Sequence, residues 1–318
     1  MTKTLTRAEA ARFLLEGDNY CLLTHRRPDG DTLGSAAVLC LGLRALGKTC
    51  HILRNPETTP RFAWLHEGLT VEEPAEDAIL VSVDVASPGM LSDAFQQYLG
   101  RVKLRIDHHS AATSFTDLET VDGASASCGE LVWDILEEMG VEMTQPMADA
   151  LYTAISTDTG CFRFSNTTAH TFAVAAKCAA AGARVYELNQ ELFETNSLGR
   201  LRIQGWIVEH LKLLSGGTMA IVSIPRSVEE QLGLIEDDMD NISNFPRTVA
   251  GVCMAATLRE EKSGRVKLSV RAVPGYDATA ITTRFGGGGH KGAAGASFSC
   301  TLEDAAGLVE AAMLEVDR

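Results

Sequence analysis

The 318-residue sequence contains eight cysteines, but no two of them form a C-x-x-C pair. A zinc ribbon or a thioredoxin-type redox motif is therefore unsupported. Most of the cysteines lie in apolar stretches, which is typical of buried free thiols in a reducing compartment. The sequence also lacks an apolar run of membrane-spanning length, and charges recur throughout its first 18 residues instead of a signal-peptide pattern. We therefore expect a cytoplasmic protein that has no membrane partner.

The sequence is also poor in positive charge. It has 28 Lys and Arg residues against 42 Asp and Glu residues, which gives a formal net charge of −14 at pH 7. Proteins that hold long nucleic acids by their phosphates are usually basic, so we do not expect a long duplex as a partner. A small anionic substrate is compatible with this charge, because metal ions and a few local basic residues can reverse the potential of one cleft.

The length and the hydrophobic periodicity predict two domains. The first half of the sequence alternates between short apolar runs and segments of helical spacing. Strands are predicted at 20–24, 50–53, 78–83 and 103–106, and helices at 33–46, 128–139, 146–157 and 168–181. This alternation predicts a parallel α/β sheet.

The last third of the sequence has a different pattern. A helical segment at 188–214 is followed by predicted strands at 218–224, 248–258, 266–272 and 296–300, a glycine-rich loop at 286–289 and a helix from 302. We therefore predict an α/β domain over 1–190, a helical linker over 191–215 and a smaller α+β domain over 216–318.

Acidic and histidine residues collect at the ends of these predicted elements. The first strand, two later strands and one helix each run into such residues, which are His25, Asp29, Asp31, Asp84, Asp107, His108, His109 and Asp158. Because ligands of open α/β sheets bind at the carboxyl ends of the strands, we expect these loops to converge on one crevice.

The residue types indicate a metal centre. Carboxylates bind hard divalent ions, and imidazole shifts the preference from Mg²⁺ toward Mn²⁺, Fe²⁺ or Zn²⁺. These acidic and histidine side chains are more numerous than the ligands of one ion, and they suit two ions about 3.5–4 Å apart. Taken singly, an Asp at such a position is more often a helix cap or a turn residue, and a single His more often has a structural role. Gly30 could simply form a turn between the two aspartates. The combination of four such loops favours the metal site.

A second signal is the run of four glycines at 286–289, which His290 and Lys291 follow. Glycine lets backbone N–H groups approach an anion closely, so the run predicts an anion site. The alternative is a flexible linker, although the run lies between a predicted helical segment and a predicted strand.

The segments H-x-x-P-D-G-D at 25–31, Asp84, D-H-H at 107–109 and Asp158 resemble the four motifs of DHH phosphoesterases in order and spacing. The resemblance covers essentially the whole chain. It implies one ion held by His25, Asp29 and Asp84, and a second held by Asp31, Asp84, His108 and Asp158. By the same resemblance, His109 faces the substrate phosphate, and Asp107 orients the motif.

The glycine run resembles the G-G-G-H loop of the DHH-associated C-terminal domain, which binds substrate. The resemblance implies substrate contacts from Arg271, Asn244, Gly287, Gly288, Gly289 and His290. Arg163 follows the last metal motif and is a candidate for stabilising charge in the transition state. For Arg163 and Arg271, an ordinary surface arginine is the alternative.

The resemblance also narrows the expected substrate. Family II pyrophosphatases carry a basic substrate motif in place of the glycine loop, and RecJ-type exonucleases usually have further domains. The chain is most similar in organisation to bifunctional oligoribonuclease/pAp phosphatases and to stand-alone c-di-AMP/pApA phosphodiesterases, which the sequence does not separate. A catalytically inactive nucleotide-binding protein is the alternative from another class. We expect two Mn²⁺-type ions and a site in the cleft between the domains, and a homodimer is left open.

Overall fold

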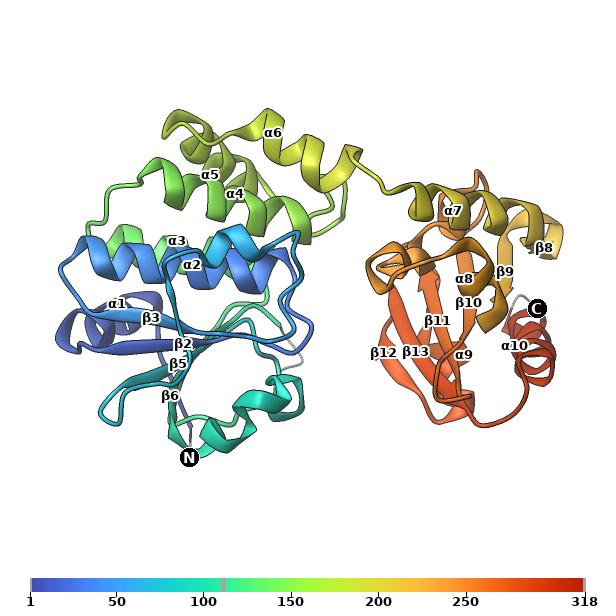
Figure 1. Ribbon diagram of the computed structural model, residues 1–318, viewed down its shortest axis with the longest axis horizontal. Coiled ribbons are helices and arrows are strands. Elements are labelled where there is room, and N and C mark those ends of the chain that lie inside the picture. Colours follow the sequence, from blue (N-terminus) through green and yellow to red (C-terminus); the bar gives the residue numbers. More distant parts are fainter. Residues whose placement is uncertain (1, 110–112, 317–318) are drawn as a thin grey trace. The chain divides into compact units, whose positions relative to one another are not determined.

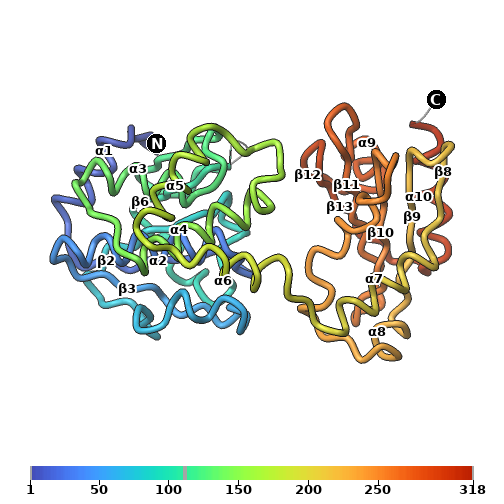
Figure 2. Tube along the Cα trace, turned by 90° about the horizontal axis from the view of Figure 1, so that it is seen from above, coloured from blue at the N-terminus to red at the C-terminus, as the bar shows by residue number. Residues whose placement is uncertain are grey.

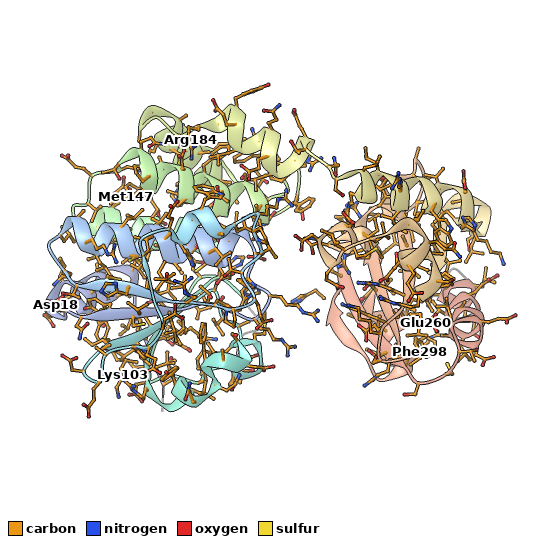
Figure 3. The ribbon with its side chains drawn as sticks, in the orientation of Figure 1. Asp18, Lys103, Met147, Arg184, Glu260 and Phe298 are labelled. Carbon is orange, nitrogen blue, oxygen red and sulfur yellow. The ribbon has the colours of Figure 1, made fainter. Side chains whose placement is uncertain are left out.

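The computed structural model describes residues 2–109 and 113–316. The chain forms two compact units, Met1–Thr195 and Asn196–Arg318. The first contains a parallel sheet with helices, and the second a mixed sheet with helices, so the predicted fold class is confirmed. Met147 is buried in the first unit and Phe298 in the second, where Figure 3 labels both side chains.

The first unit is built on a seven-stranded sheet in which every pairing is parallel. Its strands are β1 (Lys3–Thr4), β2 (Tyr20–Leu23), β3 (Cys50–Leu53), β4 (Thr70–Val71), β5 (Ile79–Val83), β6 (Val102–Asp107) and β7 (Leu118–Val121). The strand order is β1-β7-β6-β5-β2-β3-β4. The chain moves from β2 to one side through β3 and β4, and β5, β6 and β7 follow on the other side. The order therefore reverses between β2 and β5, which is where open α/β sheets bind ligands.

Helices cover one face of this sheet in layers. They are α1 (Arg7–Glu16), α2 (Gly30–Ala45), α3 (Cys128–Glu138), α4 (Gln145–Asp158) and α5 (Ala169–Ala180). Helix α4 packs on α2 and α3, and α5 packs on α4 farther from the sheet (Figure 1). The other face packs against Phe95 and the 3₁₀ segment Asp93–Arg101. Leu22 contributes to the helical side and its neighbours Cys21 and Leu23 to the other, which is why this strand is apolar throughout.

The predicted linker over 191–215 differs from the structure. Helix α6 (Val185–Asn189) and the π-helical turn Gln190–Glu194 end at an extended Thr195, and a new helix α7 (Leu198–His210) then begins. Ile203 and Ile207 of α7 pack on Val222, so this helix belongs to the second unit.

The second unit has a six-stranded sheet of order β12-β13-β11-β10-β9-β8. Its strands are β8 (Lys212–Leu214), β9 (Met219–Ile224), β10 (Met254–Glu260), β11 (Val266–Ala272), β12 (Gly288–His290) and β13 (Ala293–Phe298). Only the β9–β10 pairing among these described strands is parallel. Helix α10 (Leu302–Val316) packs on one face through Val309 and Met313, while α7 and α8 (Arg226–Leu232) pack on the other. Figure 2 shows α10 near β9 and away from β12.

Two predicted strands of this unit have different limits. The strand predicted at 248–258 begins only at Met254, because a 3₁₀ turn at Pro246–Thr248 and the left-handed Gly251 (φ 87°) precede it. The strand predicted at 296–300 begins earlier, at Ala293.

No helix in the described part of the chain has both the length and the apolar character that crossing a bilayer requires. All eight cysteines are free thiols, and five of them are buried.

Candidate metal and active site

The structure brings the predicted ligands together where the strand order reverses. Three groups of side chains have potential ligand atoms within 4.8 Å of one another: His25 with Asp29 and Asp84, Asp31 with His108 and Asp158, and Asp84 with His108 and His109. These residues follow β2, β5 and β6, or lie at the ends of α2 and α4. The carboxyl edge of the sheet therefore gathers four segments that are far apart in the sequence.

Asp84 lies at the centre of this arrangement. Its Oδ2 is 3.6 Å from Nε2 of His25, and its Oδ1 is 3.6 Å from Nε2 of His108. The side chain is buried, and among the described residues Oδ1 accepts no hydrogen bond. Its backbone is left-handed (φ 61°), a conformation that costs free energy for any residue with a side chain. Each carboxylate oxygen thus faces a different histidine, as a bridging ligand would.

The first group is fixed by backbone contacts. Nδ1 of His25 donates to the carbonyl of Arg26 at 2.8 Å, which turns Nε2 toward Asp29 and Asp84. Asp29 caps α2, because its Oδ1 accepts the N–H groups of Asp31 and Thr32. Asp29 therefore caps the helix and also lies beside His25 and Asp84.

The second group is held by the start of α3 and by Ser125. Asp31 accepts the backbone N–H of Cys128 at 2.7 Å and that of Gly129 at 3.0 Å. Nδ1 of His108 donates to the carbonyl of Ser125 at 3.2 Å, so its Nε2 lies 3.7 Å from Asp31 and from Asp158. These contacts fix the ligand atoms and leave the outward imidazole nitrogen available.

Gly30 lets helix α2 approach helix α4 closely, and it does not form a turn. A Cβ at this position would lie 2.5 Å from Oγ1 of Thr157, the residue before Asp158. The start of α2 can therefore pack directly against the end of α4, which brings Asp31 and Asp158 to the same site.

Asn166 supports Asp158 and was not predicted. Its amide donates to the backbone carbonyls of Asp158 at 3.1 Å and of Ala126 at 2.9 Å. A single Asn eight residues after the motif carries no recognisable sequence signal, because its partners are backbone groups of two separate segments.

Crowding of the carboxylates determines the electrostatics of the site. Burial, together with the nearby carboxylates of Asp84 and Asp29, raises the pKa of Asp158 to about 8. Burial likewise raises the pKa of Asp31 well above its ordinary value, with Asp84 and Asp158 adding to the effect. Burial lowers the pKa of His25, but hydrogen bonds to Asp29 and Asp84 outweigh it and raise that pKa to about 11. A divalent cation would relieve this repulsion between carboxylates.

The donor set therefore fits a pair of divalent ions. Buried carboxylates repel one another, an Asp84 oxygen lacks a partner among the described residues, and two imidazoles present Nε2 toward the carboxylates. Mixed carboxylate and imidazole donors suit Mn²⁺-type ions better than Ca²⁺.

His109 is held differently from His108. Its Nδ1 donates to Oδ1 of Asp107 at 2.8 Å, and the same oxygen accepts its backbone N–H at 3.2 Å. This hydrogen bond raises the pKa of His109, as does Asp84, against the effect of burial. Because Asp107 occupies Nδ1, the other ring nitrogen is the one available to a ligand.

A buried arginine that was not predicted, Arg105, lies next to Asp107, the partner of His109. Arg105 on β6 is 1% exposed, forms an ion pair with Glu119 at 2.7 Å and lies 3.6 Å from Oδ2 of Asp107. Burial alone raises the pKa of Asp107, but the hydrogen bonds from His109 and the nearby arginine lower it overall. An Arg in the middle of a predicted buried strand was the signal that could have indicated this residue.

Arg163 is exposed, and its Nε donates to the carbonyl of Gly160 at 2.5 Å. It follows two residues with left-handed backbone, Cys161 and Phe162 (φ 59° and 61°). Its predicted role in stabilising charge stays a prediction.

The second unit places two predicted substrate residues in direct contact. Nε of Arg271 on β11 donates to Oδ1 of Asn244 at 2.8 Å. His290 on β12 is linked to Arg271 by strand register, because Ala293 on β13 pairs with both of them. Directly opposed residues of neighbouring strands project from the same face, so His290 and Arg271 share one face of the sheet.

The predicted glycine-rich loop is in part an edge strand. A Cβ at Gly287 would lie 2.1 Å from the carbonyl oxygen of Gly295, and one at Gly289 (φ 141°) would lie 2.6 Å from that of Ala293. These two glycines therefore allow close packing on β13. A Cβ at Gly288 would meet nothing within 4 Å. The predicted contacts of Gly287, Gly288, Gly289 and His290 with substrate stay predictions.

We expect Gly287→Ala to destabilise the second unit by about 1–3 kcal/mol, because the methyl group would overlap backbone atoms of β13. The matched variant Gly288→Ala should change stability by no more than about 0.5 kcal/mol. Scanning calorimetry of both proteins measures the difference. Equal thermal midpoints would show that β12 does not pack on β13 as described.

Comparison with known proteins places this architecture in a family. The N-terminal domain of the DHH family matches residues 19–155, and the DHHA1 domain matches residues 217–315. The bifunctional oligoribonuclease and PAP phosphatase NrnA of Thermus thermophilus is 34% identical over 285 residues, covering 89% of this chain and 85% of the relative. The protein of the same name from Bacillus subtilis is 27% identical over 296 residues, covering 92% and 93%.

A crystal structure of an exopolyphosphatase-related protein from Bacteroides fragilis has the same fold. Its TM-score is 0.89 at 21% sequence identity, with 98% of this chain and 96% of that chain covered. Fold, site and relatives together define a hydrolase of phosphoester bonds. The chain belongs to the DHH family, and its second unit contains the DHHA1 domain.

Proposed function

We propose that this chain is a two-metal phosphoesterase that hydrolyses short oligoribonucleotides, and pAp, to mononucleotides. The observation that carries the proposal is the central position of Asp84, whose two carboxylate oxygens face different imidazoles. The relatives named for oligoribonuclease and PAP phosphatase activity support the choice of substrate class. The eight free thiols agree with a cytoplasmic location.

The candidate ligands divide between two ions. His25, Asp29 and Asp84 would hold one, and Asp31, Asp84, His108 and Asp158 the other. When bound, Mn²⁺-type ions would supply an activated water and Lewis acidity toward the phosphoryl oxygens. Ser125 and the α3 amides would keep His108 and Asp31 oriented, since these contacts hold the two side chains without using the imidazole Nε2.

Other residues of the chain would contact the substrate. His109, oriented by Asp107, would donate a hydrogen bond from its outward nitrogen to the phosphate. Arg163 would approach the charge that develops in the transition state. In the second unit, Arg271 would bind a phosphate, with Asn244 fixing the direction of its guanidinium group.

The function is tested by measuring kcat/KM against substrate length in the presence of Mn²⁺. We expect a dimer such as pApA and oligoribonucleotides of up to five nucleotides to be cleaved far faster than a 24-mer, because the net charge of −14 offers no basic track for a longer backbone. Exhaustive chelation should abolish turnover.

Equal rates for the dimer and the 24-mer would replace the proposal with a RecJ-like exonuclease. Preferential cleavage of c-di-AMP would replace it with a cyclic dinucleotide phosphodiesterase. Turnover of none of these substrates would favour an inactive nucleotide-binding protein, and full activity after metal removal would contradict the two-metal site.

A further inference from the structure

One short segment, residues 125–129, leads into α3 and contacts two candidate ligands of the second ion directly. The carbonyl of Ser125 accepts a hydrogen bond from Nδ1 of His108 at 3.2 Å. The first two N–H groups of α3 donate to the carboxylate of Asp31 at 2.7 and 3.0 Å. The position of the 125–129 segment therefore determines the position of ligand atoms from two separate elements of the fold.

Within this segment, side chains bind both backbone groups of Ala126. Its N–H donates to Oε2 of Glu130 at 3.2 Å, and its carbonyl accepts from the amide of Asn166 at 2.9 Å. The same Asn166 amide donates to the carbonyl of Asp158 at 3.1 Å, so a third ligand residue is joined to the segment through Ala126. Ala126 is 1% exposed, so these two side chains, and not solvent, hold its backbone.

The contact of Glu130 differs from that of an ordinary capping residue. Glu130 is the third residue of α3, and its own N–H donates to Oγ of Ser127, which caps the helix. In a capping box, the glutamate at this position accepts the N–H of the cap residue itself. Here it accepts the N–H of Ala126, one residue earlier. The carboxylate therefore holds the chain before the helix, next to the residue that contacts His108.

The carboxylate of Glu130 also costs free energy where it lies. The residue is 1% exposed, and its Oε1 has no hydrogen-bond partner in the described part of the chain. A buried carboxylate with an unpaired oxygen is unfavourable for folding, and an apolar side chain of similar volume is often as stable or more stable. Stability alone therefore does not account for a glutamate at this position, whereas a role in holding the ligands does.

We infer that Glu130 is a positioning residue for the second ion, because it holds Ala126 and with it the 125–129 segment. The hydrogen bonds described for His25 and Asp29, which belong to the first ion, are to residues outside this segment. The inference rests on the two-metal site of the proposed function. It predicts that loss of the Glu130 contact affects one ion and not the other.

The test is a calorimetric titration of Mn²⁺ alone into the metal-free full-length protein. Asp29 belongs only to the first group of ligands and Asp158 only to the second, so Asp29→Asn and Asp158→Asn identify the two binding events. Glu130→Met keeps the volume of the side chain but removes the acceptor. We expect it to weaken binding of the second ion about 10- to 100-fold and that of the first by less than about 3-fold.

Three further variants control this comparison. Glu130→Gln keeps an oxygen that can accept from Ala126 and should retain the affinity for the second ion within about 3-fold. Glu138→Met removes an exposed carboxylate at the end of the same helix and should change neither affinity. Asn166→Ala removes the other side-chain contact of Ala126 and should give the same selective loss, which keeps the test decisive if Glu130→Met fails to fold.

A role in helix capping alone would lower the thermal midpoint and leave both Mn²⁺ affinities unchanged, or would weaken both ions equally, and either result would overturn the inference. A loss of the second ion in Glu130→Gln as large as in Glu130→Met would also overturn it, because the charge and not the contact with Ala126 would then matter. Because the titration contains no substrate, binding of two ions without cleavage of any oligoribonucleotide would contradict the proposed function alone. Binding of fewer than two ions by the wild type would contradict both.

Discussion

Asp84→Asn is expected to lower kcat/KM for a short oligoribonucleotide by roughly 10³-fold or more, since a shared metal ligand supports several kcal/mol of transition-state stabilisation. The side chain lies in two of the three candidate ligand groups, and each of its oxygens faces a different imidazole. Loss of its charge should also reduce the number of metal ions bound per chain, which elemental analysis measures.

Asparagine is the informative replacement because Asp84 has a left-handed backbone (φ 61°). Asn adopts this conformation more readily than Ala, so the variant removes the charge without adding backbone strain. Asp93→Asn is the matched control, because Asp93 is exposed in the same unit and outside the candidate ligand groups. Normal metal content in Asp84→Asn would contradict the bridging assignment.

The parallel sheet could be predicted because its strands are buried on both faces. Its strand Cys50–Leu53 has the predicted limits, since an apolar run defines it clearly. The strand Val266–Ala272 of the second unit also has the predicted limits, because its residues alternate between apolar and polar. Strand β7 was missed because its residues, Leu118–Val121, include a charged and a polar residue and form no apolar run. Helix α1 was also missed, although Thr6 and Glu9 form a capping box that could have indicated its start.

The candidate site was predictable to the extent that side chains alone define it. The motif residues carry their own chemistry, so their convergence at the sheet edge follows from the strand order. Backbone donors do not have such a signature: the N–H groups of Cys128 and Gly129 contact Asp31 from 97 and 98 residues away. The sequence predicts only a loop at the glycine run, because no sequence pattern shows that Gly287 packs against the backbone of β13.

His109→Ala should give the opposite combination of effects from Asp84→Asn. We expect kcat to fall about 10²- to 10⁴-fold, the range for a positioned group that assists proton transfer or stabilises the reacting phosphate. Metal content should stay at the wild-type level, because Asp107 occupies Nδ1 of His109, whereas His108 presents Nε2 to Asp31 and Asp158.

Elemental analysis and single-turnover kinetics on His109→Ala and His108→Ala distinguish the two histidines. His108→Ala should lose both activity and metal, and His210→Ala, an exposed histidine of the second unit, should retain both. Asp107→Asn tests the orienting role, since it keeps the shape of the side chain but weakens the hydrogen bond to Nδ1. Its kcat should lie between those of the wild type and His109→Ala. If His109→Ala instead lost metal as fully as His108→Ala, the roles assigned to the two histidines would be wrong, and His109 would have to be the metal ligand.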